Sequence, residues 1–232
     1  MNREEITQLF EQQAPNYDTQ WQKMASITDG MYFLICVIIE SLPANAKILC
    51  VGAGTGKEVQ FLADRFPSWQ FTIVEPSHSM MGICVDTMTK AGYLSRCSFH
   101  EGYLDTLTAK KHEYDAATCL FVSHFILDVG ERTDFFKSIA SHLKPKGLIV
   151  SSDLSFDVNS KNYESVLGLW LQVMSRADVS PESVEKMKAT YAKDVAILSE
   201  EKIISILSNA GFIAPTCFYQ AGLIRAFFAK RN

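Results

Sequence analysis

The sequence predicts an α/β protein with a doubly wound, Rossmann-like sheet, and three observations support that prediction. Apolar runs of strand length alternate with amphipathic helical stretches between residues 46 and 153. The first run ends in a cluster of glycines, as strands do where a parallel sheet meets a ligand. After residue 211, two apolar runs follow each other with a glycine between them, which indicates a closing pair of strands.

The alternation passes through five expected strands and three expected helices. Buried strands of parallel sheets are nearly continuous apolar runs, whereas helices place apolar residues every three or four positions. On that basis we expect strands at 46–51, 70–75, 96–100, 115–122 and 147–153. We expect helices at 57–66, 77–91 and 131–143, with Ser77 or Ser79 capping the second and Pro145 stopping the third.

Helical segments flank this core on both sides. Residues 1–43 hold two expected helices, 3–13 and about 24–42, which Pro15 and Pro43 end. Residues 155–195 hold two more, at 160–176 and 181–194, and with no strand between them we expect a cap over the carboxyl edge of the sheet. A helix at 199–210, capped by Ser199, and strands at 212–219 and 222–229 complete the chain. No repeat or linker interrupts residues 1–232, so we expect one domain.

The composition is ordinary for a globular protein, with 47% hydrophobic and 21% charged residues. A net charge of −4 gives no general attraction to nucleic acid, although a local patch can still hold a structured RNA. The most apolar run, 31–39, is about half of the roughly 20 residues that a membrane-spanning helix needs. The acidic, amphipathic start differs from a secretory signal. We therefore expect a cytoplasmic protein without a membrane partner.

Six cysteines are spread along the chain without any CxxC pair. Most of them lie inside apolar runs of the expected strands and helices. This pattern favours buried free thiols in a reducing compartment over disulfides or a metal site.

The strongest functional signal is the glycine loop at Gly52, Gly54 and Gly56, between an apolar strand and a helix. Glycines permit positive φ angles and a close approach of the backbone to a ligand, and the following helix offers free N–H groups. The spacing is GxGxG and not the dinucleotide pattern GxGxxG. A phosphate-binding Walker loop needs Ser or Thr after its lysine, but Glu58 follows Lys57.

An acid stands at the end of the next expected strand. Glu75 follows Gly56 by 19 residues, and a carboxylate at that position can accept hydrogen bonds from both hydroxyls of a ribose. The alternative is a surface acid at a strand end. Met80 lies about one helical turn later, where its thioether can pack either on an adenine ring or in the core.

With these motifs the sequence resembles the class I S-adenosylmethionine (SAM) dependent methyltransferases over nearly its whole length. The matching segments are the loop Leu49–Gly56, the acid Glu75, the turn Leu143–Gly147 and the final strand pair. The resemblance implies a seven-stranded sheet whose last strand is antiparallel. It also implies that SAM is the cofactor, bound by Gly52, Ala53, Gly54, Thr55, Gly56, Glu75, Pro76, Met80, Tyr103, Leu104 and Leu120.

Two positions depart from the family pattern. Cys50 stands where the family has an aspartate that holds the methionine part of SAM through water. Tyr103 stands where the family has an aspartate that contacts the adenine amine, and Asp105, two residues later, is an alternative for that role.

The expected reaction is methyl transfer to a small-molecule acceptor. His124, just after the fourth expected strand, is a candidate base for an acceptor hydroxyl or, alternatively, a helix-packing residue. Tyr17 belongs to an Ala-x-x-Tyr-Asp segment that many small-molecule methyltransferases share, where the tyrosine closes over the cofactor or substrate. Its alternative role is to anchor the first helix. Trp21, Tyr163 and Trp170 are candidates for lining an apolar pocket beneath the cap.

Three other functions stay open at this point. The segment 119–147 and the cap are similar to carboxy-SAM synthases of tRNA wobble-uridine modification, which need a cap arginine. The stretch 185–188 has lysines there, and Arg176 is the only arginine of the cap. A non-catalytic SAM-binding module and a nicotinamide oxidoreductase are the remaining alternatives, the latter disfavoured by the glycine spacing. A homodimer is compatible with a cap that packs on a second chain.

Overall fold

The computed structural model describes residues 1–22, 24–176 and 180–232. Its centre is one seven-stranded sheet with the strand order β3-β2-β1-β4-β5-β7-β6. Strands β1 to β5 are parallel, and β7 runs antiparallel to both of its neighbours, which confirms the expected fold class. The strands are β1 (Lys47–Val51), β2 (Gln70–Glu75), β3 (Cys97–Glu101), β4 (Tyr114–Leu120), β5 (Leu143–Leu154), β6 (Phe212–Ala221) and β7 (Ile224–Arg231).

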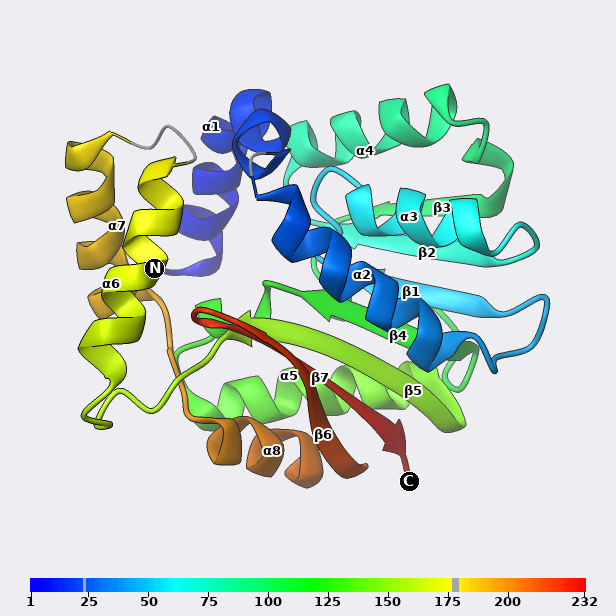
Figure 1. The fold of residues 1–232 in the computed structure, drawn as a ribbon. Coiled ribbons are helices and arrows are strands. Elements are labelled where there is room, and N and C mark those ends of the chain that lie inside the picture. The colour runs from blue at the N-terminus through cyan, green and yellow to red at the C-terminus, as the bar shows by residue number, and fades with distance from the viewer. Residues whose placement is uncertain (23, 177–179) are drawn as a thin grey trace.

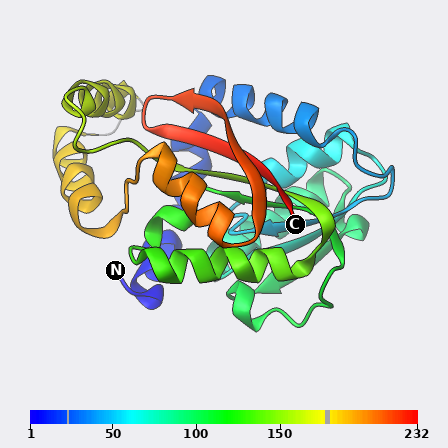
Figure 2. The same ribbon diagram turned by 90° about the horizontal axis from the view of Figure 1, so that it is seen from below.

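Helices cover both faces of the sheet, as Figures 1 and 2 show. One face carries α2 (Ala25–Ile39), α3 (Lys57–Arg65) and α4 (His78–Lys90), and the other carries α5 (Val129–His142) and α8 (Glu200–Asn209). Successive residues of β1 serve the two layers in turn, because side chains alternate across a strand. Ile48 and Cys50 pack under α2 and α3, whereas Leu49 and Val51 face the opposite core.

The strand order reverses direction between β1 and β4. In open α/β sheets such a switch point forms a crevice outside the carboxyl ends of the strands, where ligands bind. The glycine loop follows β1 at this place, and the loop with the 3₁₀ helix Ser123–Phe125 follows β4. The topology therefore puts the predicted site residues at the crevice.

Helix α1 (Arg3–Gln22) differs from the expected 3–13, because it runs through Pro15. Proline inside a helix removes one hydrogen bond and crowds the preceding turn, which is why a break was expected. Tertiary packing outweighs that penalty here: Ala14 is buried, and Phe10 and Tyr17 on either side of Pro15 join an aromatic cluster. Among the described residues no single helix is long and apolar enough to cross a membrane, and only α1 with α2 passes as a pair, bent by 86°.

The start of β5 also differs from expectation. Helix α5 ends at His142, and β5 begins at once with Leu143, so the segment predicted as a turn lies inside the strand. Its pairing with β4 is irregular between Tyr114 and Ala116, and Lys146 has a positive φ of 64°. An irregularity in the ladder thus replaces the predicted turn before the strand.

The cap consists of α6 (Tyr163–Arg176) and α7 (Pro181–Asp194), which lie beside α1 at one end of the sheet (Figure 1). The chain leaves the sheet at Ser155 and returns to pair with it at Leu198. Residues 177–179 of the predicted cap fall outside the described residues.

Candidate cofactor-binding site

The three glycines of the loop all have positive φ angles, of 68°, 55° and 81° in order. A Cβ atom on Gly52 would collide with the side chain of Val122, and one on Gly56 would lie 2.6 Å from Sγ of Cys84. A Cβ atom on Gly54 would meet nothing within 4 Å. Two glycines are therefore needed for packing, while the third leaves open space over the loop, as a close-lying ligand requires.

Glu75 is 5% exposed and lies directly against this loop. Its Oε2 accepts a 2.9 Å hydrogen bond from the backbone N–H of Gly54, and Oε1 accepts one of 2.9 Å from Ser77. Burial raises the pKa of this carboxyl, and the two backbone hydrogen bonds partly oppose that shift. A carboxylate has about four acceptor positions, so Glu75 keeps capacity for further donors such as hydroxyl groups.

Helix α1 is fixed to the glycine loop and to the start of α4 by two acids. Asp18 accepts a 2.6 Å hydrogen bond from the hydroxyl of Thr55 and forms a 3.2 Å ion pair with Lys57. Glu11 accepts from the Ser77 hydroxyl at 2.8 Å and from the Ser79 amide at 3.1 Å, at the first turn of α4. Neither acid was a predicted site residue, because their partners are remote in sequence.

The two residues near the expected adenine position also contact α1. The hydroxyl of Tyr103 donates to the backbone oxygen of Arg3 at 2.6 Å and lies 2.9 Å from the hydroxyl of Thr7. Asp105 forms a 2.7 Å ion pair with Arg3, and both side chains are more than half exposed. Both polar groups of this segment are therefore engaged with the first helix.

Aromatic side chains fill the space between α1 and the loop after β4. Trp21 stacks on Phe121 with ring centroids 5.6 Å apart, and Phe10 meets the edge of Phe125 at the same separation. Tyr17 lies 6.0 Å from Trp21, and its pKa is raised by burial and by the nearby charge of Glu75. Phe121 has a φ of +60°, a strained conformation for a bulky residue that is often found at functional sites.

The remaining predicted cofactor residues surround the same crevice. Met80, Leu104 and Leu120 are buried, whereas Ala53 and Pro76 are partly exposed. Burial of Met80 in α4 is compatible with both roles that the sequence left open. The contacts of these residues with a cofactor stay a prediction.

His124 is held in a buried polar network. Its Nδ1 lies 3.3 Å from Oδ1 of Asp153, its backbone N–H donates to the same oxygen at 2.8 Å, and its carbonyl accepts from Ala196. Asp153 also binds Arg132 at 2.9 Å and the hydroxyl of Ser123 at 2.7 Å. These contacts support the packing role that the sequence left open, and a role as base stays a prediction.

Sequence reasoning missed this network. A charged residue at the end of the apolar run 147–153 was the signal for Asp153, since a buried acid needs a partner. Nothing local distinguishes Arg132 from an exposed helix residue, yet it is fully buried.

Trp170 lies against the hairpin of the last two strands. Its ring carbon would be 3.0 Å from a Cβ atom on Gly222, and its indole N–H donates to the hydroxyl of Tyr191 at 3.0 Å. Tyr163 packs on Phe156. These contacts explain Trp170 and Tyr163 as packing residues of the cap. Trp21, the third aromatic residue that the sequence proposed for the pocket, lies at the crevice.

Comparison with known proteins shows a similarity to methyltransferases. Residues 48–147, which run from β1 into β5 and include the glycine loop and Glu75, match the family described as methyltransferase domain. This segment is therefore similar to methyltransferase domains, and the chain as a whole shares the fold of SAM-dependent methyltransferases. SAM is the cofactor of this family, and the open space over Gly54 and the buried acceptor Glu75 fit it.

Solved structures share the fold. A putative O-methyltransferase from Nostoc punctiforme PCC 73102 has a TM-score of 0.68 at 16% identity, covering 96% of this chain and 60% of that one. A SAM-dependent methyltransferase from Methanosarcina mazei has a TM-score of 0.63 at 14% identity, covering 84% and 96%. An uncharacterised protein from Synechococcus sp. is 23% identical over 135 residues, which are 58% of this chain and 30% of that protein. The matched part thus spans less than a third of this relative.

Removing the carboxylate of Glu75 is expected to weaken SAM binding. The change Glu75→Ala leaves the ribose hydroxyl groups without an acceptor and removes the hydrogen-bond partner of the Gly54 amide. We expect the binding free energy to fall by about 1–3 kcal/mol, which is roughly 5- to 150-fold in affinity. The matched control is Glu101→Ala, because Glu101 is the register partner of Glu75 on β3 and its side chain is half exposed. Calorimetry with SAM compares the two, and equal affinities would show that Glu75 is only a strand-end acid.

Proposed function

We propose that this protein transfers the methyl group of SAM to a small organic acceptor that binds beneath α1. The observation that supports it is the aromatic cover over the switch point, where Trp21 and Phe10 of α1 meet Phe121 and Phe125 of the loop after β4. Apolar, partly enclosed surfaces of this kind suit small ligands. A large folded acceptor would have to displace a helix that Asp18 and Glu11 fix to the glycine loop and to the start of α4.

When bound, SAM supplies an electrophilic methyl group on a sulfonium. Methyl transfer is an in-line displacement, so the protein's contribution is to align the acceptor and to exclude water. The glycine loop and Glu75 position the ligand on the sheet side of the crevice, and the aromatic residues of α1 shield the opposite side. His124 is the candidate base when the acceptor is a hydroxyl.

A labelling experiment tests the acceptor class. The purified protein is incubated with methyl-labelled SAM and a cell extract that has been split by ultrafiltration into small molecules and macromolecules. We expect label in the small-molecule fraction only. Label confined to protein or RNA would contradict a small acceptor. Binding of SAM without any transfer would favour the non-catalytic module, and a retained ligand with the mass of carboxy-SAM would favour the synthase.

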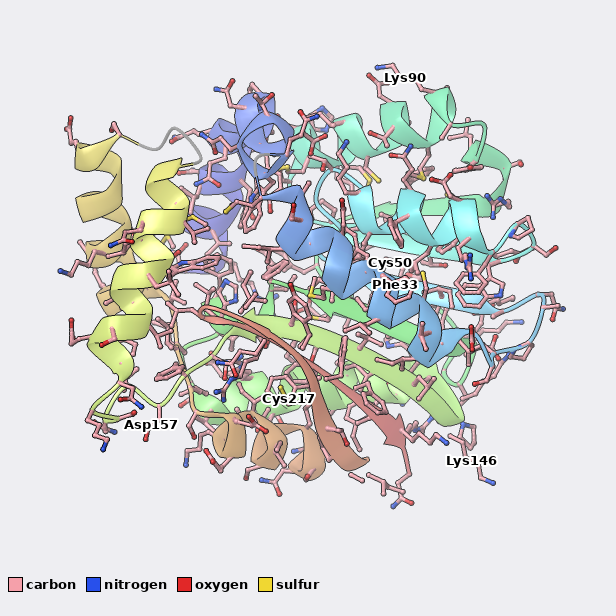
Figure 3. All side chains as sticks on the ribbon, viewed as in Figure 1. Phe33, Cys50, Lys90, Lys146, Asp157 and Cys217 are labelled. Carbon is pink, nitrogen blue, oxygen red and sulfur yellow. The ribbon has the colours of Figure 1, made fainter. Side chains whose placement is uncertain are left out.

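We also propose a cytoplasmic location and keep a homodimer as a prediction. The six cysteines are free thiols in the structure, as is typical of reducing compartments. Phe33 (Figure 3) and Val37 lie one helical turn apart on α2, and their exposed fractions are 62% and 48%. Light scattering after gel filtration measures whether the purified chain forms a dimer.

A further inference from the structure

Glu58 is a buried acid that the proposed reaction does not explain. It lies in the first turn of α3, immediately after the glycine loop, and is only 7% exposed. The hydroxyl of Thr118 donates a 2.6 Å hydrogen bond to its Oε1, and the thiol of Cys50 is its second side-chain partner. Within the described part of the chain, no ion pair to Glu58 is formed, although buried glutamates are rarely found without a cation.

The groups around Glu58 do not supply the missing positive charge. The titratable side chains whose electrostatic influence reaches it are Tyr17 of α1, Tyr32 of α2, Cys50 of β1, Cys84 of α4 and, on the opposite face of the sheet, Cys119 of β4. Burial raises the pKa of each of these five groups, so all of them are neutral at pH 7. The charged side chains at the loop itself are further acids, except for Lys57, which pairs with Asp18.

Burial raises the pKa of Glu58 to about 7, and the hydrogen bonds from Thr118 and Cys50 only partly oppose that shift. The carboxyl is therefore close to half ionised at neutral pH. A cation that arrives beside it will favour the ionised form and lower its pKa. Glu58 is thus a buried carboxylate without a cationic partner, and a positively charged ligand can supply that partner.

The position of Glu58 connects it to the crevice. Together with Leu120, the last residue of β4 at the switch point, it borders a gap between α2, α3 and β4 that is closed to water in the free protein. Cys50, its thiol partner, lies in β1 on the face of the sheet that α2 and α3 cover (Figure 3). By the resemblance, Cys50 stands where the family has an acid, and the carboxyl of Glu58 is the hydrogen-bond partner of its thiol.

We propose that the carboxylate of Glu58 is the acceptor for the α-ammonium group of SAM. SAM carries two positive groups, and only the ammonium has N–H donors, whereas the sulfonium has none. The inference rests on SAM as the ligand of the glycine loop, and it is independent of the methyl acceptor.

If Glu58 binds the ammonium group, SAM binding releases protons and the affinity for SAM depends on pH. Because SAM binds the ionised form, binding near pH 7 releases about half a proton, and the affinity falls about fivefold between pH 7 and pH 6, a range in which the α-amino group of the ligand stays largely protonated. The direction follows from the raised pKa of the free protein: the complex holds fewer protons than the free protein, so higher pH favours binding. S-adenosylhomocysteine carries the same ammonium without the sulfonium and is expected to give the same proton release.

Calorimetry of SAM binding at pH 6, 6.5 and 7, in buffers of different ionisation enthalpy, measures both quantities. In Glu58→Gln we expect no proton release, no pH dependence between pH 6 and pH 7, and an affinity at pH 7 at least fivefold below that of the unchanged protein. The glutamine oxygen still accepts from Thr118, so the fold is kept, and circular dichroism checks this. Glu101→Gln, at an exposed acid of the same sheet edge, is the control and is expected to behave like the unchanged protein.

Three results would overturn the proposal. They are wild-type affinity of Glu58→Gln at pH 7, a proton release that persists in this variant, and a proton release with SAM that is absent with S-adenosylhomocysteine. If the unchanged protein binds SAM without pH dependence, only the role of Glu58 is wrong. If it does not bind SAM at all, the cofactor assignment is wrong as well.

Discussion

Replacing Gly54 by valine is expected to abolish SAM binding while the protein stays folded. Gly54 has a φ of +55°, and its missing side chain would point into space that no protein atom occupies within 4 Å. Valine there costs roughly 1–2 kcal/mol in backbone strain, a fraction of a typical folding stability. The branched side chain would fill the space over the loop, so calorimetry is expected to show an affinity at least 100-fold lower.

The control for this change is Gly211→Val. Gly211 also has a positive φ, of 94°, and open space at its Cβ position, but it follows α8 far from the loop along the chain. Both variants carry the same kind of backbone strain, so thermal unfolding is expected to shift by similar amounts. Only Gly54→Val is expected to lose SAM. Wild-type binding by a folded Gly54→Val would show that the ligand does not lie over the loop.

Replacing Arg132 by methionine is expected to have the largest effect on stability. Arg132 and Asp153 are both fully buried and 2.9 Å apart, and the guanidinium also donates to Ser123 and to the carbonyl of Ala196. Removing one partner of a buried pair leaves the other charge uncompensated, which costs about 3–5 kcal/mol. Urea unfolding measures the loss. Lys137→Met, which breaks an exposed pair with Asp134, is the control and is expected to change stability by less than about 1 kcal/mol.

The pH dependence of this loss gives a second check. Burial alone would raise the pKa of Asp153, but the Arg132 guanidinium and the His124 side chain hold it below its usual range. The unchanged protein therefore keeps the contribution of Asp153 above the unfolded pKa near 3.8 and loses it only as the pH falls through the lower, folded value. Without Arg132, burial raises that pKa, so the stability gap is expected to widen from pH 4 to pH 7. A gap that is constant with pH would contradict a buried charge at Asp153.

The order of strands and helices was predictable from the sequence because their apolar periods are local. The boundaries that differ depend on contacts made elsewhere in the fold. Pro15 stays helical because aromatic residues on both sides of it pack against the crevice. Leu143 starts a strand at once because β4 pairs with it, which local turn chemistry does not reveal.

The local motifs of the candidate site were predictable from the sequence, but its contacts between remote residues were not. The glycines of the loop and Glu75 are recognisable because a strand, a turn and a fixed spacing lie close together in the sequence. The acids that complete the site are not, since Asp18 meets Thr55 across 37 residues and Glu58 meets Thr118 across 60. Such pairs come together only when the sheet forms, and a single sequence shows each of them as an ordinary surface acid.

The position of the cofactor is most directly tested by a crystal structure of the protein with S-adenosylhomocysteine. We expect the ribose hydroxyls within hydrogen-bonding distance of the Glu75 carboxylate and the ligand chain over Gly54, with both contacts at the switch point between β1 and β4. A ligand bound elsewhere, with Glu75 contacting only Gly54 and Ser77, would contradict the assignment of the glycine loop as the SAM site.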